Sequence, residues 1–598
     1  MNKQGTEKIL RAVGVAVVTG SLVFSQVPTA ALAEGVSASQ GGGQSTDGGT
    51  PPEKPEGESD GSNGGEAPGG SGDGQPGEPP DGTGGGAGGE APDGQPGGAG
   101  GMGSANTMTL DYSGSYSGAI TADGESVTAS DETYEASEAD VNAALAQNGG
   151  ALALTGIALS KSGDDTNGDN CNFYGLNSIL LAVGESSTAT VQNCELSATS
   201  EGSNGIFATD SATVLAKDVT ISTTAGNSRG LDATYGGTIL AGNVTIQTQG
   251  DHSGGVATDR GGGSISLVGG SISTAGSGSP LLYSTGNIQV SDVTGTATGS
   301  QLVGMEGLNT VLISNSTLES TQTEKTASDP VADGVIIYQS TSGDAEASTG
   351  ETATFQAVDS TLKSAITSGS MFYLTNTTAD VVLKNTVLDF DSSAANLLYA
   401  AGNDANSWGT AGKNGATVKF TGIQQELSGN VVADTISSID LHLTDGTTWT
   451  GAASIEENSA GSTSETPLTV NVGSTSKWVV TADSTVSALN VADGGQVVDA
   501  EGKTVTIVAA GQTVVSGDSD LTVTVSGSYS TSYDESSAGS VSTDTIDRTA
   551  YTDAFGEDET QSDVATSNTT VTDTTTEAST QTSWWDAVVA WFKGLFGM

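Results

Sequence analysis

Side chains with metal-binding or redox chemistry are scarce in this chain. Its 598 residues include two cysteines and two histidines, and aromatic residues make up 5%. Neither cysteine nor histidine recurs at the spacing of a metal-ligand set, which argues against a zinc site. We therefore expect no metal centre built from these residues.

Basic residues are also rare. The chain has 17 Lys and Arg against 71 Asp and Glu, a formal net charge of -54. Nucleic-acid partners are excluded on this ground, because binding to phosphates needs basic patches. The acidity favours solubility and is typical of an extracellular protein.

The N-terminus has the three parts of a secretory signal peptide. A basic start (Lys3, Lys8 and Arg11) precedes an apolar run over 12–24 that is too short to span a membrane comfortably, and Ala31-Leu32-Ala33 fits a cleavage site. We expect residues 1–33 to be removed and the protein to be secreted, extracellular or on the cell surface. A retained anchor is the alternative.

Two tracts have too few apolar residues to form a packed core. Residues 34–106 are almost wholly Gly, Pro, Glu, Asp and Ser, and residues 529–582 are rich in Ser, Thr, Asp and Glu. Both are predicted to be disordered acidic linkers.

Between the linkers, an Asn or Asp before a short apolar run returns at a nearly fixed step. The series is Asn193, Asp218, Asn243, Asp292, Asn315, Asp359 and Asn385, with Gly269 in its gap. The steps are 25, 25, 26, 23, 23, 44 and 26 residues, and the long one contains an insertion. A fixed period of this size is typical of a solenoid whose repeats stack on one another.

Each step holds three short β-rich runs separated by Gly, Ser, Asn and Asp. This pattern predicts an all-β fold, a right-handed parallel β-helix with three strands per coil of about 22–26 residues. We expect it over 107–528, with an N-terminal cap and first coil (107–166), main coils (167–430), and C-terminal coils and cap (431–528).

The coil pattern resembles the pectin-lyase-like β-helix superfamily, and more narrowly secreted adhesin-like proteins. Gly230-Leu231-Asp232-Ala233-Thr234-Tyr235 and Ser279-Pro280-Leu281-Leu282-Tyr283 carry the resemblance, and the stretch from Trp478 to Leu489 resembles the closing part of autotransporter passenger domains. The resemblance implies the fold. It leaves function open, because lyases, hydrolases, adhesins and structural spikes share this fold.

In most coils an apolar triplet, such as Ile206-Phe207-Ala208, comes about 10 to 13 residues after the Asn or Asp. The residues at the end of this strand, just after the triplet, are the least repetitive part of the coil. Insertions at 160–170, 319–332, 341–352 and 402–415 flank it, as expected for loops that frame a binding face. We expect a ligand groove there, formed by Tyr235, Asp259, Arg260, Tyr283, Glu306, Tyr338, Gln339, Asp344, Thr375 and Asn376.

Four tyrosines, Tyr283, Tyr338, Tyr373 and Tyr399, are expected to share one column of this strand. They would then stack as an aromatic row against sugar rings, or alternatively fill the interior of wider coils. Asp259 and Arg260 are also compatible with a local ion pair of structural use.

No catalytic set is apparent, so we assign no catalytic residues and lean against an enzyme. Of the motifs of pectinases, only Gly163-Asp164-Asp165 is present. Asp259 and Glu306 are expected two coils, roughly 10 Å, apart, beyond the separation usual in glycosidases. The prediction is an exported cell-surface protein of adhesin type that binds glycans or host and neighbour surface molecules. The alternatives are a polysaccharide lyase or glycoside hydrolase, and a structural surface-layer component.

The sequence contains one weak candidate for a calcium site. Asp165, Asn167 and Asp169 alternate like the start of an EF-hand loop, but Asn170 replaces the required Gly and Leu176 stands at the twelfth position. A solvated acidic loop is the alternative. Cys171 falls outside the register, in an inserted loop. A disulfide with Cys194 and two buried thiols both fit the sequence.

The last residues, 583–598, form an amphipathic helical pattern that is too short to span a membrane. We expect membrane or envelope contact through its apolar face, or docking on another protein or on the solenoid. The contact residues would be Trp584, Trp585, Val588, Phe592, Leu595 and Phe596.

Overall fold

The computed structural model describes residues 109–340, 345, 352–403 and 408–556. The predicted signal peptide (1–33), the first linker (34–106) and the C-terminal amphipathic segment (583–598) lie outside these residues. No helix in the part described is long and apolar enough to cross a membrane.

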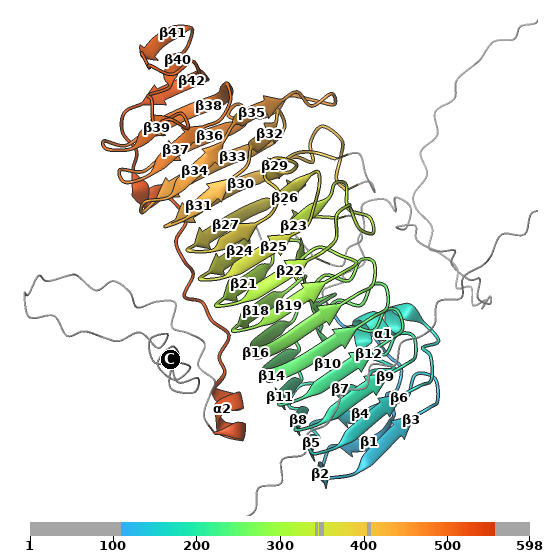
Figure 1. Cartoon of the computed structure of the whole chain (residues 1–598). Coiled ribbons are helices and arrows are strands. Elements are labelled where there is room, and N and C mark those ends of the chain that lie inside the picture. Colours follow the sequence, from blue (N-terminus) through green and yellow to red (C-terminus); the bar gives the residue numbers. More distant parts are fainter. Residues whose placement is uncertain (1–108, 341–344, 346–351, 404–407, 557–598) are drawn as a thin grey trace, which may run out of the picture. The chain divides into compact units, whose positions relative to one another are not determined.

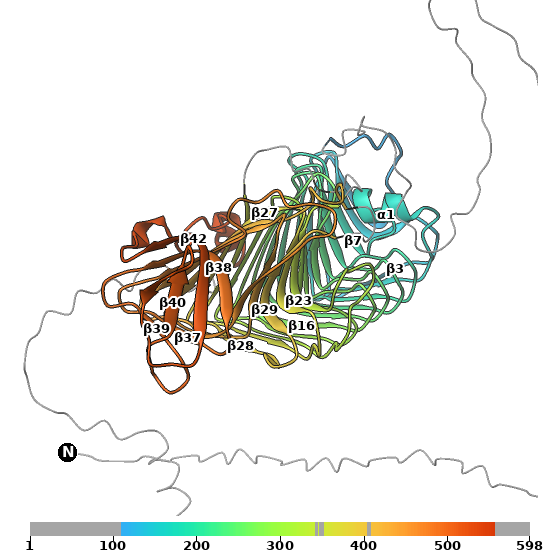
Figure 2. The same cartoon turned by 90° about the horizontal axis from the view of Figure 1, so that it is seen from above.

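The described chain winds into a parallel β-helix, whose coils stack along one axis (Figure 1; Figure 2). Ile206 pairs with Leu231, and Leu231 with Val256, so equivalent residues sit side by side at the step of 25 seen in the sequence. Every strand pairing is parallel except that of β40 with β41. The predicted all-β parallel β-helix is confirmed.

The strands belong to three sheets. Sheet A holds β1 (Gly118–Asp123), β4 (Asn142–Gln147), β7 (Leu180–Val183), β10 (Ile206–Thr209), β13 (Leu231–Ala233), β15 (Val256–Thr258), β17 (Leu282–Ser284), β20 (Val303–Glu306), β23 (Asp333–Tyr338), β26 (Ser370–Thr375), β29 (Asn396–Ala400), β32 (Val431–Asp434) and β35 (Ala453–Glu456). Sheet C holds β31 (Glu426–Ser428), β34 (Thr448–Gly451), β37 (Lys477–Val480) and β39 (Gln496–Val498).

Sheet B contains the other two strands of most coils. Its members are β2 (Ser126–Ser130), β3 (Thr133–Ala136), β5 (Ala151–Thr155), β6 (Ala158–Lys161), β8 (Thr188–Gln192), β9 (Glu195–Ala198), β11 (Thr213–Lys217), β12 (Thr220–Thr223), β14 (Thr238–Thr248), β16 (Ser264–Thr274), β18 (Asn287–Ser291), β19 (Thr294–Ala297), β21 (Thr310–Ser314), β22 (Thr317–Ser320), β24 (Ala353–Val358), β25 (Thr361–Ser364), β27 (Thr378–Lys384), β28 (Val387–Asp389), β30 (Thr417–Ile423), β33 (Ser438–Thr444), β36 (Leu468–Val472), β38 (Ser484–Val491), β40 (Thr506–Ala509), β41 (Gln512–Val515) and β42 (Thr522–Ser530).

Three strand segments per coil are thus present, and in β14 and β16 the two sheet B segments are continuous. Two coils, β1 to β3 and β4 to β6, precede helix α1 (Gly168–Tyr174). The sequence predicted a cap and one coil in this region. The same turn is present in these coils, at Asp131 (φ 56°) and Gly156 (φ 67°), but the step from Gly156 to Asn193 is 37 residues because the α1 segment is inserted, so the first two coils fell outside the series.

The recurring Asn or Asp marks one sharp turn in each coil. Asn193, Asp218, Asn243 and Asn385 have φ between 48° and 54°, the left-handed region that Asn, Asp and Gly tolerate best. Neighbouring members also bond to each other, as Asn243 Nδ2 does to Asp218 Oδ1 at 2.6 Å. Backbone conformation therefore explains the periodic signal.

The interior is a set of stacked apolar columns. In sheet B, Val214, Ile239, Ile265, Ile288 and Val311 lie in register and are fully buried. Each coil covers its neighbours' side chains, so the apolar surface is removed from water only by stacking.

The chain after the last coil turns back along the outer face of sheet B. Residues 531–556, here called the C-terminal strap, contain a short 3-10 helix η1 (Glu535–Ser537) and helix α2 (Thr549–Phe555). The strap passes from the C-terminal coils back to β11 and β14, where Tyr551 is fully buried against Leu215 and Leu240 (Figure 1).

One outward column of sheet B holds the strap through side chains. The backbone N–H groups of Gly539, Ser542 and Ile546 donate to Thr421 Oγ1 (2.9 Å), Gln356 Oε1 (2.7 Å) and Gln289 Oε1 (2.9 Å). Leu312 and Val382 occupy the coils between. The donors are three and then four residues apart along the strap, a rise of about 10 and 13 Å in an extended chain, and each step spans two coils of the column, roughly 9.6 Å.

The strap differs from the disordered linker predicted over 529–582. Residues 531–556 are ordered on sheet B although their composition is polar. Their backbone N–H groups bond to side chains of one sheet B column, and Tyr551 packs against Leu215 and Leu240. The rest of that predicted linker, 557–582, lies outside the described residues.

Candidate ligand-binding site

A cavity of about 300 Å³ opens on the outer face of sheet A, and we call it the sheet A pocket. Helix α1 contributes Asn172 and Phe173, and residues 321–332, the part of the predicted 319–332 insertion that follows β22, contribute Thr326 and Asp329. Its floor includes Arg229, Asp259, Tyr283 and Tyr338. One of the four predicted insertions, 319–332, therefore frames it, together with the α1 residues that follow the predicted insertion at 160–170.

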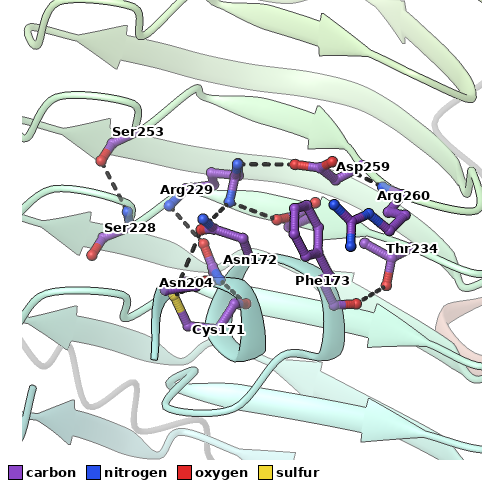
Figure 3. Close-up of polar contacts among 12 residues, drawn as sticks. Cys171, Asn172, Phe173, Asn204, Ser228, Arg229, Thr234, Ser253, Asp259 and Arg260 are labelled. Carbon is purple, nitrogen blue, oxygen red and sulfur yellow. Dashed lines mark hydrogen bonds and ion pairs between the residues drawn. The ribbon is translucent and has the colours of Figure 1, made fainter. Parts of the chain in front are cut away.

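Helix α1 forms because its ends are capped. Asn167 Oδ1 accepts hydrogen bonds from the N–H groups of Asp169 and Asn170, and Gly175 ends the helix with φ 76°. The helix sits on sheet A through Thr234 Oγ1, which donates to Phe173 O at 2.8 Å, and Asn204 Nδ2, which donates to Cys171 O at 3.1 Å (Figure 3).

Cys171 thus lies in an inserted segment outside the coil register. It and Cys194 are both buried free thiols. The second of the two alternatives left open by the sequence is therefore the one observed, and burial raises the pKa of the Cys171 thiol.

Arg229 is the charged centre between α1 and sheet A (Figure 3). Its guanidinium donates to Asp259 Oδ2 at 3.0 Å and to Asn172 Oδ1 at 2.7 Å, and lies 3.5 Å from Asp232 Oδ2. Burial raises the pKa of Asp232 well above its usual value, although Arg229 opposes this. A raised pKa favours the neutral form of Asp232, so the ion pair here is that of Arg229 with the Asp259 carboxylate.

Tyr283 and Tyr338 give the pocket an aromatic wall. Tyr283 Oη donates to Glu306 Oε2 at 2.9 Å, and Ser340 Oγ also donates to the Glu306 carboxylate. The Tyr338 ring stacks on Trp408 with centroids 4.3 Å apart. Both phenol rings are half-buried, so part of each ring remains open to a ligand.

Two buried carboxyl groups lie at the end of the 321–332 insertion. Asp329 lines the pocket, and Asp333 begins β23. Burial raises the pKa of Asp329 to about 7, with Lys325 opposing, and burial together with Asp329 raises the pKa of Asp333 well above its usual value. Near neutral pH this part of the pocket holds a proton that most carboxyl groups would release.

The structure brings together part of the predicted groove. Asp259, Tyr283 and Tyr338 line the pocket, and Glu306 contacts Tyr283. Asp259 directly follows β15 and Glu306 ends β20, with β17 between these strands, so the two residues lie two coils apart as expected.

Other predicted residues lie elsewhere. Tyr235 stacks on Tyr174 at 5.8 Å, in a separate aromatic cluster, and Arg260 sits over the Phe173 ring at 3.6 Å. Both residues contact side chains of helix α1, whose position on sheet A was not predicted from the sequence.

Further along the β-helix, Gln339, Thr375 and Asn376 take part in loop hydrogen bonds instead of lining the pocket. Gln339 Nε2 donates to Ala345 O, Asn376 Nδ2 donates to Gln339 O, and Thr375 is fully buried. Asp344 lies outside the described residues.

The expected row of four tyrosines is wrong for Tyr338. Tyr283, Tyr373 and Tyr399 occupy one column, but Ile336 takes its place on β23, and Tyr338 pairs with Glu306 and Thr375 in the next column. The 321–332 insertion shifted the alignment by two residues, which keeps Tyr338 on the same face.

The weak calcium candidate has a structural use. Asn167 caps α1, while Asp169 follows it in the first turn. No group of three or more His, Cys, Asp or Glu that could hold a metal ion occurs among the residues that the structure describes. Asp165 is near Glu201 and Asp140, and burial raises its pKa.

Sequence reasoning missed Arg229, Asn172, Asp329 and Trp408. Arg229 could have been noticed because arginine is scarce: the chain has four, and this one lies in a glycine-rich turn. Asp329 had no such signal, because it lies in an insertion without a repeat to align it.

Comparison with models of protein families finds no match, and comparison with curated proteins finds none. A search of solved structures aligns the chain with "The cryo-EM structure of the Vag8-C1 inhibitor complex" at a TM-score of 0.30 and 14% identity, covering 69% of this chain and 100% of that chain. A likeness at this level carries no argument about function. The parallel β-helix is established by its strand pairing.

Proposed function

We propose that this chain is an exported cell-surface β-helix protein of adhesin type whose sheet A pocket binds a glycan. The observation that carries the proposal is the pocket itself: half-buried tyrosine rings stand beside carboxylates and an amide, framed by two insertions. Aromatic faces suit the apolar side of sugar rings, and fixed polar groups suit hydroxyls. The signal-peptide pattern of residues 1–33 supports export, and the 583–598 pattern supports contact with the envelope.

A matched pair of tyrosines tests the proposal. Tyr283 and Tyr399 share one column, are both half-buried, and each donates to a glutamate, Glu306 at 2.9 Å and Glu456 at 3.2 Å. Tyr283 lines the pocket and Tyr399 does not.

The full chain and both Tyr→Leu variants are applied to a glycan array. We expect Tyr283→Leu to lose roughly fivefold or more in binding, as stacking contacts are worth about 1 kcal/mol or more, and Tyr399→Leu to keep it. Absence of binding to any glycan, or equal losses in both variants, would contradict the proposal.

A polysaccharide-acting enzyme is the second candidate, and one observation favours it. Glycoside hydrolysis needs one protonated and one ionised carboxyl group, and burial raises the pKa of Asp329 to about 7 in a pocket beside Glu306's partner Tyr283. Incubation with acidic and neutral polysaccharides, followed by assay for new reducing or unsaturated ends, decides this. Products that persist in Asp329→Asn would rule out this residue as the acid.

A further inference from the structure

Several carboxyl groups lie in or beside the sheet A pocket, and the cations near them include Arg229 and Lys325. Arg229 is matched by Asp259 at 3.0 Å. Glu306 accepts hydrogen bonds from Tyr283 and Ser340, which are neutral donors. Asp329 and Asp333 are two further carboxyl groups, and Lys325 is the cation near Asp329.

Asp329 is held in place by its loop. Its own N–H donates to Thr326 O at 3.0 Å, and Thr326 is tied to two coils, because its hydroxyl donates to Gly299 O at 2.8 Å and accepts from the Gly278 N–H at 3.0 Å. The backbone that carries Asp329 is therefore fixed in place.

Asp329 lines the cavity, and one of its carboxyl oxygens, itself buried, lacks a hydrogen-bond partner among the described residues. The residue is 7% exposed, and Oδ2 has no partner among the described residues. Both carboxyl oxygens of Asp333, just behind it in sequence, are in the same state. Leaving a buried polar atom unmatched is costly, so a ligand that supplies a donor here gains affinity.

We infer that the sheet A pocket recognises a primary ammonium group, the protonated amine of an amino sugar, with the Asp329 carboxylate as its counter-ion. This inference rests on the proposed glycan-binding function and names the class of glycan. An ammonium group supplies three donors and a positive charge, and the neighbouring tyrosine faces attract cations as well as sugar rings.

The same charges discriminate against other sugars. A uronic acid or a sulfated sugar would bring a second negative charge next to Asp329 and Glu306, while Arg229 is already engaged by Asp259. N-acetylation of an amino sugar removes the positive charge and one or more donors. The pocket should therefore prefer the free amine to its acetylated counterpart.

Binding of the ammonium group expels the proton from Asp329. The charged and titratable groups around this carboxyl are Asp333, Lys325 and Tyr338, with Arg229 and His252 further round the cavity wall. Burial holds the proton on Asp329 up to about pH 7. Below that pH an incoming cation stabilises the carboxylate, so close to one proton passes to the buffer for each ligand bound.

The experiment uses calorimetry on the full chain with a pair of tetrasaccharides, one of glucosamine and one of N-acetylglucosamine, at about pH 6 in two buffers of different ionisation enthalpy. Asp329→Asn is nearly isosteric with the protonated acid and is expected to fold. Glu324→Gln removes a charge from an exposed position of the same insertion and is the matched control.

We expect the glucosamine tetramer to bind about tenfold or more tightly than the acetylated one, with proton release, because a charge-assisted bond replaces a neutral one. Asp329→Asn should reduce the preference to within about twofold and abolish the proton release, and Glu324→Gln should change neither. Equal affinity for the two tetramers, or a preference that survives in Asp329→Asn, overturns the inference. If neutral glycans bind at the pocket and glucosamine does not, the inference fails while the proposed function stands.

Discussion

The burial of Tyr551, which holds the end of the C-terminal strap against sheet B, depends on a glycine in β14. Gly242 on β14 faces Tyr551, and a Cβ built on Gly242 would overlap the Tyr551 hydroxyl. The Tyr551 ring is also covered by the Arg548 guanidinium, 4.3 Å from its centroid. Gly242→Ala should therefore expel Tyr551 without altering the sequence of the strap.

The expected size follows from the burial of Tyr551. A large side chain that is fully buried contributes about 2–3 kcal/mol, and its loss raises the population of the open strap roughly 30- to 150-fold. The free energy of strap opening should fall by this amount, while that of the coils, which pack independently of Tyr551, should change little.

Hydrogen exchange followed by mass spectrometry measures this directly. The N–H groups of Ile546, Ser542 and Gly539 bond to successive residues of the sheet B column, so exchange should accelerate most at Ile546 and least at Gly539. The double variant Gly242→Ala/Tyr551→Leu makes room and should restore part of the protection. Unchanged exchange over 539–551, or equal acceleration in the buried coils, would refute the reasoning.

Three further predictions concern the coils and the pocket. Asn243→Val should lower the free energy of unfolding by about 1–2 kcal/mol, since a β-branched residue is strained at positive φ, and Asn243→Gly should be within about 0.5 kcal/mol of the wild type by chemical denaturation. Arg229→Met should cost about 3–5 kcal/mol by stranding the buried Asp259 charge, and adding Asp259→Asn should recover more than half of it; a double variant as unstable as the single one would contradict the pairing. Because the folded protein keeps a proton on Asp329 that the unfolded chain releases, stability should fall as pH rises from about 4 to 7, by up to about 1.4 kcal/mol per pH unit, and Asp329→Asn should flatten this slope in thermal melts across that range.

The fold could be predicted because its signal repeats in every coil. The Asn or Asp with φ near 50° recurs at each sharp turn, and three strands must fit between successive turns. The alignment failed at the insertion before β23, where Tyr338 was assigned to the column that Ile336 occupies. The repeat period does not show at which residue the strand resumes after an insertion.

The strap was missed for a different physical reason. Its composition resembles a linker, and what orders it is a partner column whose members, such as Gln289 and Gln356, are far away in sequence. Arg548 and Tyr551 were its only local signals in a chain with four arginines.

The candidate site was predictable only in part. Tyr283 and Asp259 lie on strands in register, so their face followed from the repeat. Arg229 and Asp329 lie in a turn and an insertion, and their partners depend on how α1 and the 321–332 segment fold onto the sheet. The strand register therefore located the binding face, and the insertions determined its chemistry.

The most direct test of the central claim is an experimental structure of the full chain with the glycan that binds it best on an array. The account predicts a sugar in the sheet A pocket, with its ring against Tyr283 or Tyr338 and a polar group at Asp329. A sugar bound elsewhere, such as on the outer face of the C-terminal coils, with the pocket empty, would contradict it.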